Sequence, residues 1–308
     1  MKEIRSIHIC GMGALGLNFG LKLATALPDG ATKYLLDDAR YARYQDKHFT
    51  INGEPVHPHM VRGKEAGIAD LVIVATKYTG LFEAMDTIAP SVGEDTIILS
   101  ILNGVTSEEI LRERFGKNKV VDSVSQGMDA MHFGDEIRYS KFGELCIGLT
   151  DDATQENLDA VLALFNKAGF PYTLDLDIRH RMWSKFMLNC GLNQCACVYN
   201  ATYGDLLRDG SKEMAAMVAA MREVIALANA EGIHLTEKDL NLYLDIQRTL
   251  APENRPSMGQ DRLNKRPTEV ELFAGTVIKK AEKYGICTAV NQYLYNAVKK
   301  IEASYLGH

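Results

Sequence analysis

The sequence lacks the features of a membrane, nucleic-acid-binding or disulfide-stabilised protein. It contains no run of about 18 apolar residues, the length that a transmembrane helix needs. It has no excess of positive charge, because 34 Lys and Arg stand against 40 Asp and Glu, a net charge of −6. Neither a membrane nor a nucleic-acid partner is therefore expected. The six cysteines match neither a disulfide framework nor a zinc-site spacing, so we expect reduced thiols in a cytoplasmic protein.

The composition is otherwise that of a globular protein with a sizeable core. The chain has 308 residues, of which 46% are hydrophobic and 24% charged. At about 150 residues per domain, this length predicts two domains. In the first half, helical patterns alternate with short apolar runs, namely Ile4–Cys10, Lys33–Leu36, Leu71–Thr76, Thr96–Ser100 and the weaker Val120–Val124 and Leu145–Gly148. This alternation predicts an α/β domain with a doubly wound, mostly parallel sheet.

The second half has helical periodicity alone. Helices are predicted over residues 179–197, 211–231, 236–250, 268–284 and 291–304. Between them, residues 251–265 form a long polar stretch that contains Pro252 and Pro256 and predicts a loop. Long ordered loops in compact domains are often functional. The sequence therefore predicts a nucleotide-binding α/β domain over residues 1–177 and an all-α domain over 178–308.

A glycine loop follows the first predicted strand. Its residues match the pattern G-x-G-x-x-G and are Gly11, Met12, Gly13, Ala14, Leu15 and Gly16. In a dinucleotide-binding fold the first glycine permits a tight turn, the second lets a pyrophosphate approach, and the third lets helix pack on strand. The N-terminus of the following helix offers N–H groups to the phosphates. This position at the start of an α/β region predicts a Rossmann-type site.

The choice of nicotinamide cofactor is left open by the end of the second strand. Asp37 stands about 20 residues beyond the loop, where a carboxylate binds the 2′-hydroxyl of NAD. Arg40 follows three residues later and offers a charge for the 2′-phosphate of NADP. An ordinary solvated turn explains the aspartate equally well.

A polar stripe marks the predicted helix over residues 179–197. Lys185, Asn189 and Asn193 recur every fourth residue among apolar neighbours, so they lie on one face. Buried amides need partners, because each unsatisfied one costs about 1–3 kcal/mol. A polar ligand would supply these partners. Alternatively, the asparagines bond neighbouring helices and Lys185 extends to solvent.

Together the motifs resemble the 2-dehydropantoate 2-reductase (ketopantoate reductase) family over nearly the whole chain. The glycine loop is followed, in the family's order and spacing, by LNG at 102–104, WSKFMLNCGLN from Trp183, PSMGQD at 256–261 and RPTEVE at 266–271. The resemblance implies a Rossmann domain followed by an all-α domain of the 6-phosphogluconate dehydrogenase C-terminal-like type. It also implies reduction of ketopantoate to (R)-pantoate with NADP(H), a step towards pantothenate and coenzyme A.

The resemblance further implies a role for each matching residue. Lys185 would be the general acid, and Glu269 would hold the substrate hydroxyl and orient Lys185. Substrate groups would be bound by Asn103, Asn189, Asn193 and Ser257. Beside the cofactor would lie Lys77, and both Asn103 and Glu269 would also reach it. The chemistry is consistent, since hydride addition to a ketone leaves an alkoxide that needs a proton. No metal is required, and no ligand cluster for one is recognised.

Two departures from the family pattern keep other functions open. The glycine-rich segment after LNG is altered to Ser125-Gln126-Gly127-Met128 and His132-Phe133-Gly134, and Asp37 replaces the usual basic residue for NADP. Relatives of this fold with an acidic residue there use NAD(H) on branched or aromatic D-2-hydroxy acids. One alternative is therefore an NAD-dependent D-2-hydroxy acid dehydrogenase. Another is a regulator that binds NAD(P) without turnover. The partner expected in each catalytic case is a small 2-keto acid, and a homodimer is left open.

Overall fold

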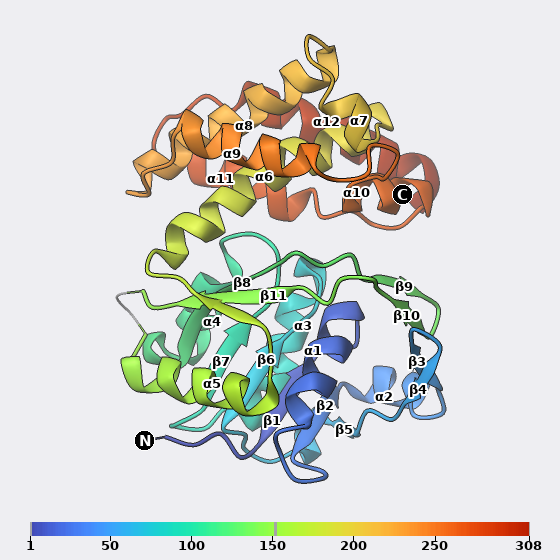
Figure 1. Ribbon diagram of the computed structural model, residues 1–308, viewed down its shortest axis with the longest axis vertical. Coiled ribbons are helices and arrows are strands. Elements are labelled where there is room, and N and C mark those ends of the chain that lie inside the picture. The colour runs from blue at the N-terminus through green and yellow to red at the C-terminus, as the bar shows by residue number, and fades with distance from the viewer. Residues whose placement is uncertain (1, 151–152, 308) are drawn as a thin grey trace. The chain divides into compact units, whose positions relative to one another are not determined.

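The computed structural model describes residues 2–150 and 153–307. The chain divides into two compact units, Met1–Ile178 and Arg179–His308 (Figure 1). The first unit is built on a mixed sheet with helices on both faces, and the second consists of helices. The predicted fold class, an α/β Rossmann domain followed by an all-α domain, is confirmed.

The large sheet of the first unit has eight strands in the order β12-β11-β8-β7-β6-β1-β2-β5. All neighbours pair in parallel except β8 and β11, which are antiparallel. Strand β1 lies inside the sheet. The chain adds β2 and β5 on one side of it, and β6, β7 and β8 on the other. The bounds are β1 Ile7–Cys10, β2 Thr32–Leu36, β5 Met60–Arg62, β6 Leu71–Val74, β7 Ile97–Ser100, β8 Val120–Gln126, β11 Glu144–Gly148 and β12 Tyr172–Leu174.

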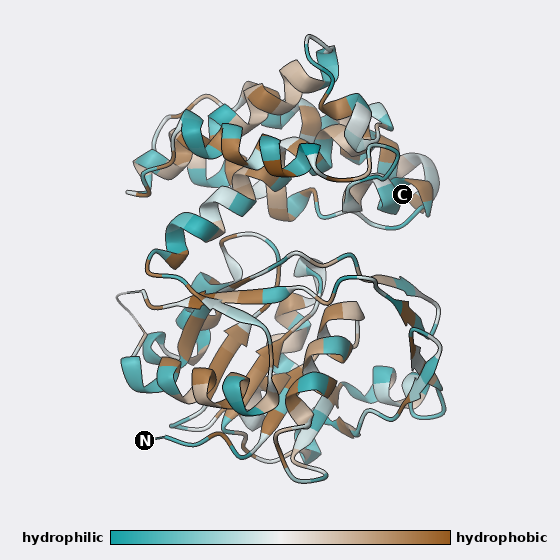
Figure 2. Ribbon diagram, in the orientation of Figure 1, coloured by the Kyte–Doolittle hydropathy of each residue, from teal (hydrophilic) through white to brown (hydrophobic). Residues whose placement is uncertain are grey.

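Helices cover both faces of this sheet. Helices α1 (Ala14–Ala24) and α5 (Gln155–Ala168) share one apolar cluster with alternate strand residues such as Ile7 and Ile73. Helices α3 (Leu81–Ile88) and α4 (Ser107–Phe115) share a second cluster with the intervening residues, such as Val72. Because successive strand side chains point to opposite faces, a strand covered on both sides must be apolar throughout. The brown central strands of Figure 2 have this composition.

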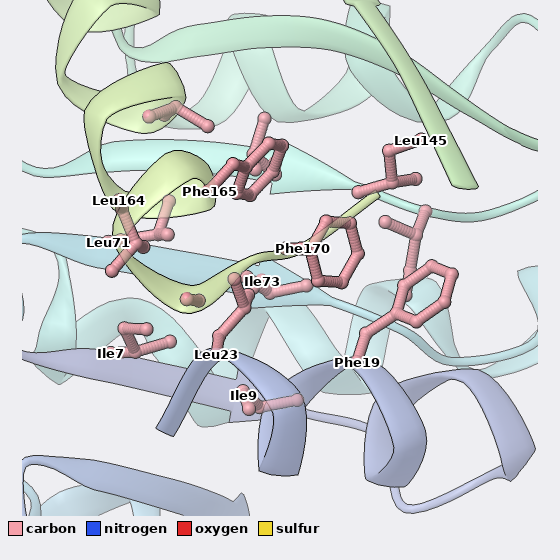
Figure 3. Close-up of a cluster of buried hydrophobic side chains, with 14 of the residues drawn as sticks. Ile7, Ile9, Phe19, Leu23, Leu71, Ile73, Leu145, Leu164, Phe165 and Phe170 are labelled. Atoms are coloured by element: carbon pink, nitrogen blue, oxygen red, sulfur yellow. The ribbon is translucent and has the colours of Figure 1, made fainter. Parts of the chain in front are cut away.

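The core between α1, α5 and the sheet is aromatic at its centre (Figure 3). Phe170 packs edge-on against Phe19 of α1, with ring centroids 5.0 Å apart, and lies 4.7 Å from Phe165 of α5. Such ring pairs add about 0.5–1.5 kcal/mol each to the free energy of burial. They fix α1, and with it the glycine loop at its start, on the sheet.

Short elements complete the first unit, and the sequence patterns did not predict them. A four-stranded sheet has the order β4-β3-β10-β9. Its strands are β3 Phe49–Ile51, β4 Glu54–Val56, β9 Met131–Phe133 and β10 Glu136–Arg138. Helix α2 spans Asp38–Tyr44, and single 3₁₀ turns are η1 Gly63–Glu65, η2 Tyr78–Gly80, η3 Ala89–Ser91 and η4 Lys117–Lys119. Elements of three to seven residues carry too few side chains for a period to be visible.

The second unit contains helices alone among its described residues, as predicted. They are α6 Ile178–Tyr199, α7 Tyr203–Leu206, α8 Lys212–Ala230, α9 Glu237–Arg248, α10 Ser257–Leu263, α11 Thr276–Glu282 and α12 Ala289–Leu306, with a π-helix, η5, at Glu271–Gly275. Helix starts follow the expected chemistry, since the Ser211 hydroxyl accepts the N–H of Met214 at the beginning of α8.

One prediction for this unit was wrong. Residues 251–265 are not an irregular loop, because α10 forms inside them and buries Met258 and Asp261. Pro256 stands immediately before its first turn, where a missing N–H costs no helical hydrogen bond. A helix of seven residues is too short to show a repeating apolar pattern, so the polar composition was misleading.

Candidate functional site

The glycine loop joins β1 to α1 with two glycines that the fold requires. Gly11 has φ +120°, and a Cβ there would lie 2.4 Å from the carbonyl oxygen of Ala75. A Cβ on Gly16 would lie 2.0 Å from the carbonyl oxygen of Gly11. Gly13 differs, since a Cβ there would meet no atom within 4 Å. The space in front of Gly13 is therefore open, as close approach of a pyrophosphate requires.

The first turn of α1 is suited to an anion. No side chain caps it, and none of its first residues is acidic. Its N–H groups and its positive dipole end are thus available to phosphate oxygens. Met12 is buried, whereas Ala14 and Leu15 pack partly against the core, so the loop offers backbone rather than side-chain donors. These residues fit a dinucleotide.

The end of β2 carries an ion-pair cluster centred on Arg40. Asp37 caps α2 by accepting the backbone N–H of Arg40 at 2.7 Å, and it also accepts from the Arg40 guanidinium at 2.6 Å. A second guanidinium nitrogen donates to Glu83 of α3 at 3.0 Å. Partial desolvation by itself raises the pKa of Asp37. The hydrogen bonds and the positive charge of Arg40 outweigh it and hold this pKa below its usual value. Arg40 is thus shared by two carboxylates, and Glu83 was not identified from the sequence.

The remaining candidates of the first unit follow neighbouring strands. Lys77 comes after β6, is exposed, and precedes the turn η2. Asn103 comes after β7, is half-buried, and precedes Gly104 at φ +94°. The hydroxyl of Thr76, next to Lys77, is buried without a hydrogen-bond partner. These residues and the glycine loop all stand at carboxyl ends of parallel strands, the edge at which open α/β sheets bind ligands.

In the second unit the polar stripe lies on α6, as the spacing predicts. Asn189 and Asn193 are buried and Lys185 is half-buried. The Nδ2 atom of Asn193 donates to Oδ1 of Asn189 at 3.1 Å. This bond engages the oxygen of Asn189, which stands one helical turn from Lys185 and whose amide nitrogen is a hydrogen-bond donor. An ammonium and an amide donor therefore stand next to each other on one helix face.

Ser257 joins this stripe from α10. Its hydroxyl donates to Oδ1 of Asn193 at 2.8 Å, and the backbone N–H of Met258 donates to the same oxygen at 3.2 Å. Asn193 thereby supplies the acceptor that the first turn of α10 lacks. The structure brings Ser257, Asn193 and Asn189 together in one chain of hydrogen bonds. Asn193 is therefore bonded both within α6 and to α10. The second contact agrees in part with the alternative that the asparagines bond neighbouring helices.

Glu269 stands in a segment that packs on α6. It is half-buried between two buried residues, Thr268 and Val270. The rings of Phe273, in the π-helix that follows, and Phe186, next to Lys185, have centroids 6.4 Å apart. The segment with the carboxylate and the helix with the ammonium are therefore neighbours in the same unit.

The two units offer complementary chemistry. The first presents uncapped backbone N–H groups at a strand edge, and the second presents an ammonium, a carboxylate, amides and a hydroxyl. This second set can bind a small polar acid and protonate an oxyanion formed from it. Among the residues that the structure describes, no group of His, Cys, Asp and Glu could hold a metal ion. Within the same residues, no helix combines the length and hydropathy needed to cross a bilayer.

Comparison with known proteins gives consistent matches over both units. Residues 7–150 match the family model described as ketopantoate reductase PanE/ApbA, and residues 177–302 match its C-terminal model. A 2-dehydropantoate 2-reductase of Vibrio cholerae is 29% identical over 306 residues, 97% of this chain and 99% of that relative.

Two solved structures show the same fold over nearly the whole chain. The 2-dehydropantoate 2-reductase of Geobacter metallireducens GS-15 has a TM-score of 0.83 at 25% identity and covers 96% of this chain and 99% of its own. A D-mandelate dehydrogenase with NADH and anilino(oxo)acetate has a TM-score of 0.84 at 22% identity, with 98% and 99% covered.

Proposed function

Because the chain belongs to the ketopantoate reductase PanE/ApbA family of NAD(P)-dependent oxidoreductases, we propose that it reduces ketopantoate to (R)-pantoate, towards pantothenate. One observation carries the proposal within the helical unit. Ser257, Asn193 and Asn189 form a chain of hydrogen bonds that ends one turn from Lys185. Amide donors next to an ammonium suit a substrate with a carboxylate, a hydroxyl and a ketone.

Each residue then has a defined task. A reduced nicotinamide, when bound, would supply the hydride for the ketone carbon. Lys185 donates a proton to the ketone oxygen as negative charge develops there, which both neutralises and stabilises the alkoxide. Glu269 accepts the substrate hydroxyl and keeps the Lys185 ammonium oriented. Asn189 and Ser257 bind the polar groups of the acid, with Asn193 holding the two in register. Asn103 contacts both substrate and nicotinamide.

We propose that the dinucleotide binds to the first unit. Gly11, Met12, Gly13, Ala14, Leu15 and Gly16 wrap the pyrophosphate, and Lys77 lies beside it at the end of β6. The family resemblance implies NADP(H). Against this, the Arg40 guanidinium is already paired with Asp37 and Glu83, and both carboxylates repel a 2′-phosphate. We propose that NADH is the preferred cofactor.

This charge arrangement also favours a second candidate function. An acidic residue at Asp37 suits an NAD-dependent D-2-hydroxy acid dehydrogenase that acts on branched or aromatic 2-keto acids. The likeness to D-mandelate dehydrogenase is a likeness of fold, and the same fold serves the reductases. The two candidates therefore differ in substrate side chain and share the Lys185 chemistry.

A spectrophotometric screen separates the candidates. NADH and NADPH are each oxidised in the presence of ketopantoate, 2-keto-3-methylvalerate or phenylglyoxylate, and kcat/KM is compared. The highest value with ketopantoate supports the primary proposal, and the highest with an aromatic or branched acid supports the second. Cofactor binding without turnover on the whole panel would instead indicate a nucleotide-sensing regulator.

The cofactor preference is tested by releasing Arg40. Glu83→Gln removes one carboxylate from the guanidinium, and Asp37→Ser removes the other while keeping a residue able to cap α2. We expect each change to raise the ratio of kcat/KM for NADPH to that for NADH, the second by roughly tenfold or more, since charge-assisted bonds are worth about 1.5–3 kcal/mol. Glu113→Gln, on the exposed face of α4, is the matched control. A wild-type preference for NADPH would contradict this part of the proposal.

A further inference from the structure

We infer that Glu302 and Thr268 form the positioning device for Glu269, so that a carboxylate remote from the substrate controls the rate of reduction. The inference rests on the proposed function, because only the role of Glu269 gives the contact a catalytic consequence. Glu302 belongs to none of the sequence motifs, and Thr268, although it lies in RPTEVE at 266–271, has no role assigned to it by the family resemblance.

The contact between them is buried and has two hydrogen bonds. Glu302, on α12, is 7% exposed, and its Oε1 accepts the backbone N–H of Thr268 at 2.7 Å and the Thr268 hydroxyl at 2.8 Å. The Thr268 hydroxyl oxygen in turn accepts the N–H of Val270 at 3.3 Å. A buried carboxylate requires such donors, and charge-assisted bonds of this kind are the stronger ones. The backbone on both sides of Glu269 is therefore fixed to α12.

A second set of hydrogen bonds to α12 lies just beyond Glu269, at Glu271. Oε1 of Glu271 accepts from the Tyr295 hydroxyl at 2.7 Å and from Lys299 Nζ at 3.2 Å. Tyr295, Lys299 and Glu302 are spaced by four and three residues, so they lie along one face of α12. Lys299 Nζ also lies 3.8 Å from Oε2 of Glu302, and this ion pair links the contacts at Thr268 with those at Glu271. We name these three residues the α12 clamp.

The local backbone explains why a clamp is needed. Exposed residues 263–267 precede Glu269, and the π-helix Glu271–Gly275 follows it. π-Helices are rare, and they occur frequently at functional sites. Gly275 leaves room for the clamp, since a Cβ there would lie 3.1 Å from Oε2 of Glu271. Without anchors, a shift of about 1 Å in the carboxylate would be enough to slow a reaction that depends on orientation.

Thr268→Val tests the clamp with little change of shape. It removes the hydroxyl that bonds Glu302 and Val270 and keeps the backbone N–H. We expect kcat to fall about tenfold to a hundredfold with the KM for the cofactor unchanged, as for a misplaced catalytic group. Thr268→Ser should restore most of the loss. Glu302→Leu should act in the same direction and more strongly, and amide hydrogen exchange over residues 266–275 should accelerate.

The matched control is Thr202→Val. Thr202 donates its backbone N–H and its hydroxyl to one oxygen of Asp205, each at 3.0 Å, the same pattern as Thr268 with Glu302 but at the start of α7. This variant should lower the melting temperature comparably and leave kcat within about twofold, because it removes a cap alone.

A double-mutant cycle separates positioning from general stability. If Thr268 acts through Glu269, then Thr268→Val should have no further effect on kcat in a Glu269→Ala background. An equal loss in both backgrounds, or a kcat for Thr268→Val within twofold of wild type, would overturn the inference. A different result would contradict the proposed function, namely that the wild-type protein turns over no 2-keto acid. In that case faster exchange at residues 268–270 in Glu302→Leu would still uphold the anchoring, and unchanged exchange would overturn it.

Discussion

The Ser257 hydroxyl donates to Oδ1 of Asn193 at 2.8 Å, across 64 residues of sequence. The bond links the first residue of α10 to the polar face of α6. Since Asn193 also donates to Asn189, the position of one hydroxyl determines how two amides are turned. The substrate groups assigned to Asn189 would therefore be sensitive to a residue on another helix.

Ser257→Ala is accordingly expected to impair substrate use more than a lost surface hydroxyl would. Oδ1 of Asn193 keeps the N–H of Met258 but loses its shorter bond, so the amide chain loosens. We expect kcat/KM for the 2-keto acid to fall about tenfold, equivalent to about 1.4 kcal/mol, with cofactor affinity unchanged. Steady-state kinetics and fluorescence titration with NADH measure the two quantities. A KM that stays at the wild-type value together with an unchanged kcat would remove Ser257 from the site.

Sequence patterns predicted those parts of the site that are local along the chain. The glycine loop and the stripe of α6 depend on spacings within one strand–turn–helix or one helix, and spacing is visible in a sequence. Helix α5 was missed although its cues were present, since Thr154 caps its start and Gly169 adopts the left-handed conformation at its end.

Contacts between distant residues could not be predicted in this way. Glu83 reaches Arg40 across 43 residues, and Glu302 reaches Thr268 across 34. Each is a single charged residue on a helix surface, and nothing in its neighbourhood distinguishes it from a solvated one. Only the packing of α3 beside β2, or of α12 beside the π-helix, gives these carboxylates their partners.

Lys185→Ala should lower kcat without lowering the affinity for the cofactor. Loss of a positioned general acid reduces kcat by about 10²–10⁴-fold. Lys185→Arg should remain slow, because a guanidinium keeps its charge but does not give up its proton. Single-turnover rates and NADH fluorescence titration measure the two effects.

Lys300→Ala, at an exposed position on α12, is the control for removing one positive charge from the same unit. It should behave as wild type in both measurements. A parallel decline of cofactor affinity and kcat in Lys185→Ala would indicate that Lys185 is structural.

A buried carboxyl in the first unit gives the protein a pH-dependent stability. Burial, followed by the negative charge of Asp122, raises the pKa of Glu108 from 4.5 to about 8. Below 4.5 both the folded and the unfolded state bind the proton. Between 4.5 and 8 the unfolded chain releases it and the folded chain retains it, so the free energy of unfolding falls as pH rises.

Glu108→Gln removes this dependence because its amide is neutral throughout. Its melting temperature should exceed that of wild type increasingly from pH 5 to pH 8, by about 10 °C or more at the upper end. This follows from about 1.4 kcal/mol per pKa unit and about 2–4 °C per kcal/mol for a domain of this size. Glu113→Gln, exposed on the same helix, serves as control. Parallel melting curves for Glu108→Gln and wild type across this range would show that the carboxyl is ionised in the folded state.

Two glycines of the loop should respond oppositely to the same substitution. In Gly16→Ala the new Cβ would overlap the carbonyl oxygen of Gly11 at 2.0 Å, so α1 has to move away from the turn. In Gly13→Ala the Cβ enters space that is open for 4 Å. Gly16→Ala should therefore lower the melting temperature by several degrees, whereas Gly13→Ala should leave it unchanged or slightly raised, since alanine restricts the unfolded chain.

For cofactor binding, Gly13→Ala is the more informative of the two variants. The methyl group of Gly13→Ala occupies the space proposed for the pyrophosphate, so the Kd for NADH should rise by about tenfold or more, the cost of obstructing hydrogen bonds to a charged group. Differential scanning fluorimetry gives the stability and fluorescence titration gives the Kd. A folded Gly13→Ala protein that binds NADH as wild type does would mean that the dinucleotide does not approach the loop at this point.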